Sequence, residues 1–291
     1  MRYGFVIPGG DVRAFPALAR EAETAGWEAV FLPDCIAIVA ALDPAAGIGS
    51  DPWVALTAIA AATEGIRLGP MITPLSRRRP WKVARETATL DILSGGRLIL
   101  PVGLGALDDQ GFAGVGEPTE RATRAQLLDE ALDILAGLWS GEPFSYTGRH
   151  YHLDTMTFRP TPIQRPRIPV WVVGAWPRER SMARVPRWDG LLPNKLGEDG
   201  THQPTTPADL AAMRAYIAEH RTASTPFDIV MEGETPGGDP ARAAAIVRPF
   251  AEAGATWWLE SFWTPRPTRE GYADPLDAVR ARISAGPPRI E

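Results

Sequence analysis

The chain has very little cysteine and histidine, with one cysteine, Cys35, and four histidines in 291 residues. A single cysteine excludes an intramolecular disulfide framework and any zinc or iron–sulfur site built from several cysteines. Four histidines leave little room for a histidine-built metal centre. No stretch approaches the roughly 18 uncharged apolar residues that a membrane-spanning helix needs. The apolar run at the N-terminus is too short for a secretory signal and is interrupted by Pro8.

The charge balance is mildly acidic, with 30 basic and 35 acidic residues and a net charge of −5. This balance argues against nucleic acid as a partner. We therefore expect a cytoplasmic protein that acts on a small molecule and that binds neither nucleic acid nor a membrane. Apolar residues make up 45% of the chain, which is enough for one large core. We expect a single domain over residues 1–291.

Glycine and proline, 28 and 29 residues, are abundant and punctuate an alternating pattern. Each of eight short apolar runs is followed by a helical pattern, and the runs cover residues 3–7, 29–32, 66–72, 98–102, 168–173, 190–192, 227–231 and 256–259. A hydrogen-bond acceptor followed by proline marks a helix start at 51–52, 206–207, 239–240 and 274–275. The segment 142–167 is an excursion too small to be a domain.

Eight βα units in this length favour the α/β class and a (β/α)8 TIM barrel with insertion loops over an open doubly wound sheet. The segment Gly103-Leu-Gly105 lacks the third glycine of a dinucleotide fingerprint and leads into a loop. In a barrel, the active site lies in the loops that follow the strands.

Several motifs in series carry a family resemblance. They are Pro74-Leu-Ser-Arg-Arg-Arg-Pro80, Leu93-Ser-Gly-Gly-Arg97, Leu128-Asp-Glu-Ala-Leu-Asp-Ile-Leu-Ala-Gly-Leu-Trp-Ser-Gly141, Pro160-Thr-Pro-Ile-Gln-Arg-Pro166 and Ile168-Pro-Val-Trp-Val-Val-Gly174. The chain resembles the bacterial luciferase-like monooxygenase family of flavin- or deazaflavin-dependent barrels. The motifs follow the family's order over nearly the whole chain, to about residue 260.

The resemblance implies a site for the cofactor. It places a non-prolyl cis peptide at Met71-Ile72 under the flavin ring. Cofactor-binding residues are then expected at the strand ends: Met71, Ile72, Thr73, Gly103, Gly105, Gly174, Ala175, Trp176, Arg178, Asn194 and Lys195. Of these, the backbone from Gly174 and the side chains of Lys195 and Arg178 would hold the phosphate. The expected substrate pocket is formed by Asp34, Ala106, Glu260 and Trp263.

Two positions depart from the deazaflavin-dependent members. Many of these have a histidine where Cys35 stands, and some have a glutamate where Ala106 stands. The usual proton donors are therefore absent, and Cys35 is either a catalytic thiol or a pocket lining.

The leading hypothesis is an oxidoreductase, a monooxygenase that uses O2 and reduced FMN from a separate flavin reductase. The first alternative is hydride transfer with the deazaflavin coenzyme F420. A metal-dependent barrel hydrolase and a non-enzymatic flavin-binding protein are further alternatives. The pair His150-Tyr-His152 resembles a metal motif but does not follow the first strand. The resemblance also implies a homodimer.

Overall fold

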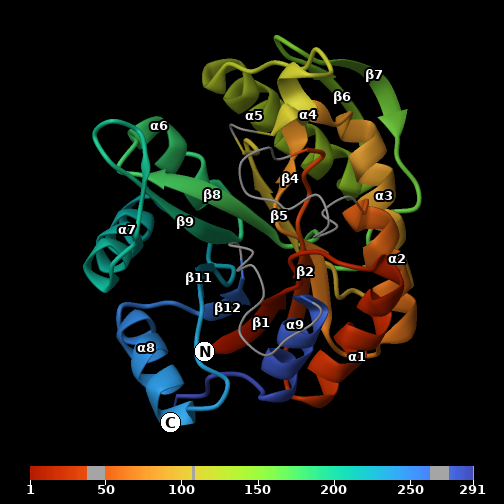
Figure 1. Ribbon diagram of the computed structural model, residues 1–291. Coiled ribbons are helices and arrows are strands. Elements are labelled where there is room, and N and C mark those ends of the chain that lie inside the picture. The colour runs from red at the N-terminus through yellow and green to blue at the C-terminus, as the bar shows by residue number, and fades with distance from the viewer. Residues whose placement is uncertain (38–49, 107–108, 263–274, 291) are drawn as a thin grey trace.

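The computed structural model describes residues 1–37, 50–106, 109–262 and 275–290 (Figure 1). In these residues a mostly parallel sheet curls nearly into a closed barrel, in the order β3-β2-β1-β12-β11-β9-β8-β5-β4. The strands are β1 (Arg2–Val6), β2 (Ala29–Leu32), β3 (Arg67–Pro70), β4 (Thr73–Pro74), β5 (Leu100–Gly103), β8 (Val170–Trp176), β9 (Gly190–Leu196), β11 (Asp228–Gly233) and β12 (Trp257–Ser261). A bridge between Leu68 and Leu98 joins the two ends of the sheet. The predicted barrel class is confirmed.

Helices cover the outside of the barrel (Figure 1). The longer ones are α1 (Phe15–Thr24), α2 (Pro52–Ala62), α3 (Pro80–Leu93), α5 (Arg121–Ser140), α7 (Pro207–His220), α8 (Pro240–Glu252) and α9 (Pro275–Ser284). Short helical turns are η1 (Val12–Ala14), η3 (Leu75–Arg77), α4 (Gln110–Ala113), α6 (Glu179–Met182) and η4 (Val185–Arg187).

Three of the four predicted helix starts are capped as expected. The Asp51 carboxylate accepts the N–H groups of Trp53 and Val54, Thr206 forms a capping box with Asp209, and Asp239 accepts from Arg242. Each cap satisfies donors that a helix leaves free at its start. The fourth predicted cap, Asp274, lies outside the described residues.

Alternate residues of each strand point into the barrel and out to the helices. The interior is filled by one cluster of buried side chains: Val6, Ala29, Phe31, Met71, Ile99, Trp171, Leu192, Val230, Trp257 and Leu259. Trp171 and Trp257 meet edge to face in it, with ring centroids 5.4 Å apart. Because the strand period is two, a residue next to one of these faces the helix layer instead.

The excursion before β8 is a two-stranded antiparallel hairpin, β6 (Pro143–Thr147) and β7 (His152–Thr157). It lies beside α5 and α3 (Figure 1). The carboxylate of Glu130 on α5 accepts the backbone N–H groups of Arg149, His150 and Tyr151 and so fixes the turn. A further short strand, β10 (His202–Gln203), pairs with the end of β9.

Candidate functional site

The interior face of the barrel is apolar around the ends of β4, β5 and β8. Ile72 and Val173 pack on the interior cluster. A Cβ at Gly103 would lie 2.2 Å from Ile72 Cδ1 and 3.0 Å from Val173 Cγ2. Glycine at position 103 therefore lets these two side chains form the floor of the barrel mouth.

The peptide bond between Met71 and Ile72 is cis, as the resemblance predicted. The proposed position of these residues under a flavin ring stays a prediction.

Asn194 adds one polar group to this apolar mouth. It pairs with Ala175, two residues beyond the inward-facing Val173, so both residues belong to the interior face. The Oδ1 atom of Asn194 is buried and has no hydrogen-bond partner among the described residues. Buried polar atoms are nearly always paired, so this oxygen is available to a donor from a bound molecule.

Four charged residues form a buried cluster at the rim of the mouth. Arg77 donates from Nη1 to the Asp109 carboxylate and from Nη2 to the backbone oxygen of Asp34, the latter at 2.9 Å. Arg78 Nη2 lies 2.8 Å from both carboxylate oxygens of Asp34. The side chains of Arg77, Asp34 and Asp109 are only 4%, 2% and 2% exposed. The cluster joins the loops that follow β2, β4 and β5.

Asp109 also holds the backbone of the loop that carries Cys35. Its carboxylate accepts the N–H groups of Ile36, Ala37 and Gly111. Burial opposes its ionisation, but these N–H groups and Arg77 together keep the pKa of Asp109 below its ordinary value. The Asp109 carboxylate is therefore ionised, and its oxygens accept hydrogen bonds from the protein's own groups.

Cys35 is half-buried beside these acids. Burial, and then the negative charges of Asp109 and Asp34, raise the pKa of its thiol to about 11. At neutral pH the thiol is protonated, so it is a weak hydrogen-bond donor and a poor nucleophile.

The residues expected to bind the cofactor phosphate already have protein partners. Lys195 Nζ lies 2.8 Å from Asp209 Oδ2 at the start of α7. Arg178 donates to the backbone oxygens of Gly197 and Glu198, and the N–H of Ala175 donates to Ser181 Oγ at 3.0 Å. These residues lie together at the ends of β8 and β9, and their phosphate role stays a prediction.

Several expected site residues face away from the mouth. Gly174 and Trp176 alternate with the inward Val173 and face the helices, where Trp176 meets Tyr216 at a centroid distance of 6.3 Å. The Cβ that Gly174 lacks would fall 2.5 Å from Leu191 Cδ1, so close packing explains this glycine. Thr73 pairs with the outward Val102 and is fully buried, so its side chain does not reach the mouth either.

Glu260 does not line the mouth, which differs from the expected substrate pocket. It alternates with the inward Leu259 and is fully buried, paired with Arg282 of α9 at 3.1 Å. Asp34, another residue of the expected pocket, directs its carboxylate to Arg77 and Arg78. Trp263 lies outside the described residues.

Gly105 and Ala106 follow β5 at the rim. Gly105 adopts φ +83°, a left-handed conformation that favours glycine. The carbonyl of Ala106 accepts from Arg124 Nη1 at 3.4 Å, and the Arg124 guanidinium stacks 3.5 Å from the Phe112 ring centroid.

Sequence reasoning missed Asp109 and Arg124, which hold these loops. The sequence did contain a signal for the Asp109 cluster. Asp109 follows β5, and the consecutive arginines Arg77 and Arg78 follow the neighbouring strand β4. Because the ends of neighbouring parallel strands meet at one rim, these opposite charges could have been expected to pair. Among the described residues, no group of three histidine, cysteine, aspartate or glutamate side chains could hold a metal ion. In the same part of the chain, no helix is both long and apolar enough to cross a membrane.

The comparisons agree with this architecture. The family model for luciferase-like monooxygenases matches residues 3–286. The chain belongs to this family. The family includes oxidoreductases of two cofactor types, one named for F420 and one for FMNH(2), and the chain is an oxidoreductase.

Three curated relatives represent what the family contains. An uncharacterised protein of Mycobacterium tuberculosis (strain ATCC 25618 / H37Rv) is 33% identical over 201 residues, 64% of this chain and 70% of that protein. The F420-dependent glucose-6-phosphate dehydrogenase of Microbacterium testaceum is 32% identical over 168 residues, 56% of this chain and 47% of its own. The FMNH(2)-dependent dimethylsulfone monooxygenase of Pseudomonas putida is 33% identical over 136 residues, 45% of this chain and 36% of its own.

Solved structures of a dehydrogenase and of a monooxygenase share the fold of this family member. An F420-dependent secondary alcohol dehydrogenase superposes with a TM-score of 0.75 at 16% identity, covering 98% of this chain and 96% of its own. A long-chain alkane monooxygenase superposes with a TM-score of 0.60 at 15% identity, covering 87% of this chain and 68% of its own. At these identities the likeness concerns the fold.

Proposed function

We propose that this luciferase-like protein is a monooxygenase that uses reduced FMN and O2 to oxidise a small organic substrate. The observation that carries the proposal is that Cys35 and the two acids beside it offer no free side-chain base at the rim, where the resemblance places a histidine in many deazaflavin-dependent members. The thiol of Cys35 is protonated at neutral pH, and Asp34 and Asp109 are engaged by arginines. Removing a proton from an alcohol during hydride transfer would require such a base.

The mouth fits a flat flavin ring. Ile72 and Val173 offer an apolar floor, and the unpartnered Asn194 Oδ1 can accept a hydrogen bond from a ring N–H. Bound reduced FMN would supply the electrons for oxygen activation. The protein's own residues would orient the ring and keep water from the reacting face.

A titration tests this proposal. The purified protein is titrated anaerobically with oxidised FMN, reduced FMN and F420, and binding is followed by fluorescence and calorimetry. We expect the tightest binding for reduced FMN, and about tenfold weaker binding in Asn194→Ala because one buried hydrogen bond is lost. Tighter binding of F420 would overturn the cofactor assignment, and binding of none of the three would overturn flavin chemistry.

Lys195→Met tests the phosphate role separately. If the Lys195 ammonium leaves Asp209 to hold the cofactor phosphate, affinity for FMN falls while affinity for riboflavin, which lacks the phosphate, does not. Equal affinities of the variant and the wild type for FMN would refute the role. Arg20→Gln, an exposed charge on α1, is the control.

Hydride transfer with F420 is the second candidate. The relative named for F420 matches more of this chain than the relative named for FMNH(2), 56% against 45%. Oxidation of a substrate that requires both O2 and reduced FMN distinguishes the first candidate from reduction of F420 by a substrate without oxygen.

Two partners belong to the same proposal. A separate flavin reductase would supply reduced FMN, and the protein would form a homodimer. Light scattering on the purified chain measures the mass directly, and a monomer at micromolar concentration would refute the dimer.

A further inference from the structure

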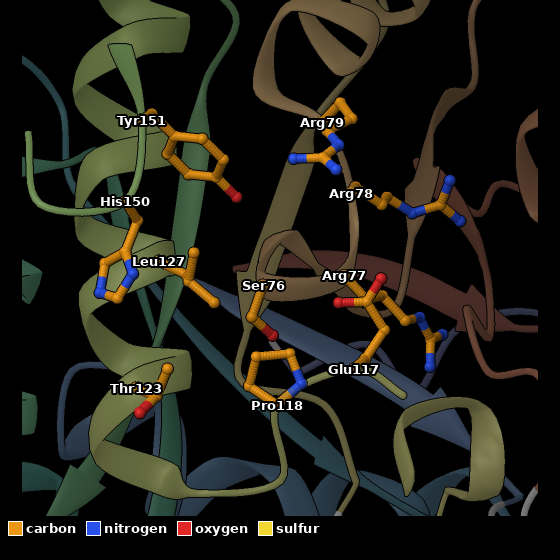
Figure 2. A pocket seen from close by; sticks show the side chains of 10 residues that line it. All are labelled: Ser76, Arg77, Arg78, Arg79, Glu117, Pro118, Thr123, Leu127, His150 and Tyr151. Carbon is orange, nitrogen blue, oxygen red and sulfur yellow. The ribbon is translucent and has the colours of Figure 1, made fainter. Parts of the chain in front are cut away.

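A pocket of about 200 Å³ lies at the rim of the barrel, between the N-terminal ends of α3 and α5 (Figure 2). This volume is far larger than one water molecule requires. Its lining residues come from η3 and the start of α3, from the segment before α5 and its first turns, and from the hairpin turn: Ser76, Arg77, Arg78, Arg79, Glu117, Pro118, Thr123, Leu127, His150 and Tyr151. Arg77 and Arg78 also belong to the charged cluster at the rim, but none of the lining residues is among those proposed to contact the flavin.

Positive charge dominates one wall of this pocket, which we call the helix-end pocket. Arg79 is exposed, and its guanidinium makes no hydrogen bond or ion pair with the described residues, unlike that of Arg77. Arg78 pairs with Asp34 through Nη2, but its Nε is buried and unpartnered in the same part of the chain. Two arginines therefore have donors that remain available.

Two helices begin at the helix-end pocket. Arg79 is the N-cap residue of α3, and Thr123 lies in the first turn of α5. Neither helix has a side-chain cap, so no side chain accepts a hydrogen bond from the free N–H groups of its first turn, although the N-cap residue of α5, Glu120, adds a negative charge there. Helix N-termini carry partial positive charge and favour anions.

Ser76 is an independent sign of a ligand. The residue is only 4% exposed, and its Oγ is buried without a hydrogen-bond partner among the described residues. In Figure 2 its side chain lies between Leu127 and Arg77, above Pro118 on the pocket floor. A buried hydroxyl without a partner destabilises a protein unless something else satisfies it.

The opposite wall is aromatic and apolar. Tyr151 packs on Trp81 with ring centroids 6.1 Å apart, and in Figure 2 its hydroxyl points toward Arg79 across the pocket. Burial raises the pKa of Tyr151, so its hydroxyl is a neutral donor. Leu127 and Pro118 add apolar surface below it. Glu117 contributes one negative charge near the floor.

We propose that the helix-end pocket binds a small organic oxyanion, with its phosphate or carboxylate group between Arg79 and Ser76. The apolar part of the molecule would lie against Tyr151 and Leu127. This arrangement satisfies the Ser76 hydroxyl and places the anion at two helix N-termini. Glu117 limits the affinity, because its carboxylate repels the ligand.

Calorimetric titrations with phenyl phosphate, benzoate and benzyl alcohol test the proposal. The three probes share a ring and differ in the attached group, so the first two distinguish a phosphate site from a carboxylate site. We expect one of the anions to bind and benzyl alcohol to bind at least about tenfold more weakly. Equal binding of benzyl alcohol, or no binding of either anion at millimolar concentration, would overturn the proposal.

Three variants locate the ligand. Arg79→Gln is expected to weaken anion binding at least about tenfold, because a charge-assisted contact is lost. Ser76→Ala is expected to weaken binding severalfold and yet not to lower the Tm of the free protein, since it removes an unsatisfied hydroxyl. Glu117→Gln is expected to tighten binding, because it removes a like charge. Arg20→Gln is the control for loss of one exposed arginine.

Unchanged affinity in Arg79→Gln would refute the location. A Ser76→Ala variant that loses Tm without losing affinity would show that the hydroxyl serves the fold alone. Flavin titration of Arg79→Gln is expected to match the wild type, so failure of this proposal and failure of the flavin proposal give different results.

Discussion

Replacing Glu260 by glutamine tests whether this residue supports the fold or the substrate pocket. Glu260 is fully buried on the outer face of β12, and its partner Arg282 is 4% exposed. The Glu260 carboxylate accepts hydrogen bonds from the N–H of Thr235 at 2.6 Å, from the Thr235 hydroxyl at 2.7 Å and from Arg282 Nη2 at 3.1 Å. These bonds join α9 to the end of the sheet.

The expected magnitude follows from the burial of this ion pair. Glutamine keeps the size of the side chain but leaves the Arg282 charge without its counter-ion in a dry environment. Removing one partner of a buried pair costs about 3–5 kcal/mol. In a chain of this size, each kcal/mol lowers the Tm by about 2 °C, so we expect Glu260→Gln to lower it by about 6–10 °C.

A double-variant cycle isolates the pair. Arg282→Met alone is also expected to destabilise the protein, whereas Glu260→Gln/Arg282→Met should lose less than the sum of the two single losses, because neither charge is left alone. Glu86→Gln is the matched surface control. It removes an exposed pair with Lys82 on α3, which is worth about 0.5 kcal/mol or less.

Thermal unfolding and flavin titration are measured on all four variants. A Tm loss below about 2 °C in Glu260→Gln, combined with loss of ligand binding, would refute the reasoning and return this residue to the barrel mouth.

Three further predictions concern the mouth and its rim. At pH 8, Cys35 should react with iodoacetamide about 100-fold more slowly than an ordinary thiol, since its pKa is about 11 instead of 9.0; a rate near that of free cysteine would contradict this. Asp109 has a folded-state pKa below 3.8, so its contribution to stability is fully present above that pH and disappears as the pH falls through the lowered pKa. Denaturation of the wild type and Asp109→Asn between pH 5 and 2 should therefore converge at acidic pH, and a constant difference would count against the linkage. Gly103→Ala places a Cβ 2.2 Å from Ile72 Cδ1 and should cost about 1–3 kcal/mol and weaken flavin binding, whereas unchanged Tm and affinity would be inconsistent with the close contact.

The order of strands and helix starts could be predicted from the sequence because the signals are local. Asp51 followed by Pro52 marks a helix start wherever the helix packs. The length of β9 was underestimated, since Asn194 and Lys195 made the end of the strand read as a loop. The β6–β7 hairpin was missed as well, although Phe144-Ser-Tyr-Thr147 alternates and Gly148 follows it.

The direction of side chains at strand ends could not be predicted. The run Trp257-Trp258-Leu259 is apolar throughout, because one face packs in the barrel and the other under helices. Such a strand shows no alternation in its sequence, and an error of one residue exchanges the two faces. For that reason Glu260 and Trp176 were assigned to the mouth but face the helix layer.

The loops at the rim are held in a way that does not depend on the side chains at positions 35 and 106. Asp109 holds the loop of Cys35 through the backbone N–H groups of Ile36 and Ala37. Arg124 holds the next loop through the backbone oxygens of Leu104 and Ala106. Because these contacts use backbone atoms, a different side chain at position 35 or 106 leaves the loop anchored. The barrel therefore keeps the same rim whether those positions carry a proton donor or, as here, a neutral thiol and a methyl group.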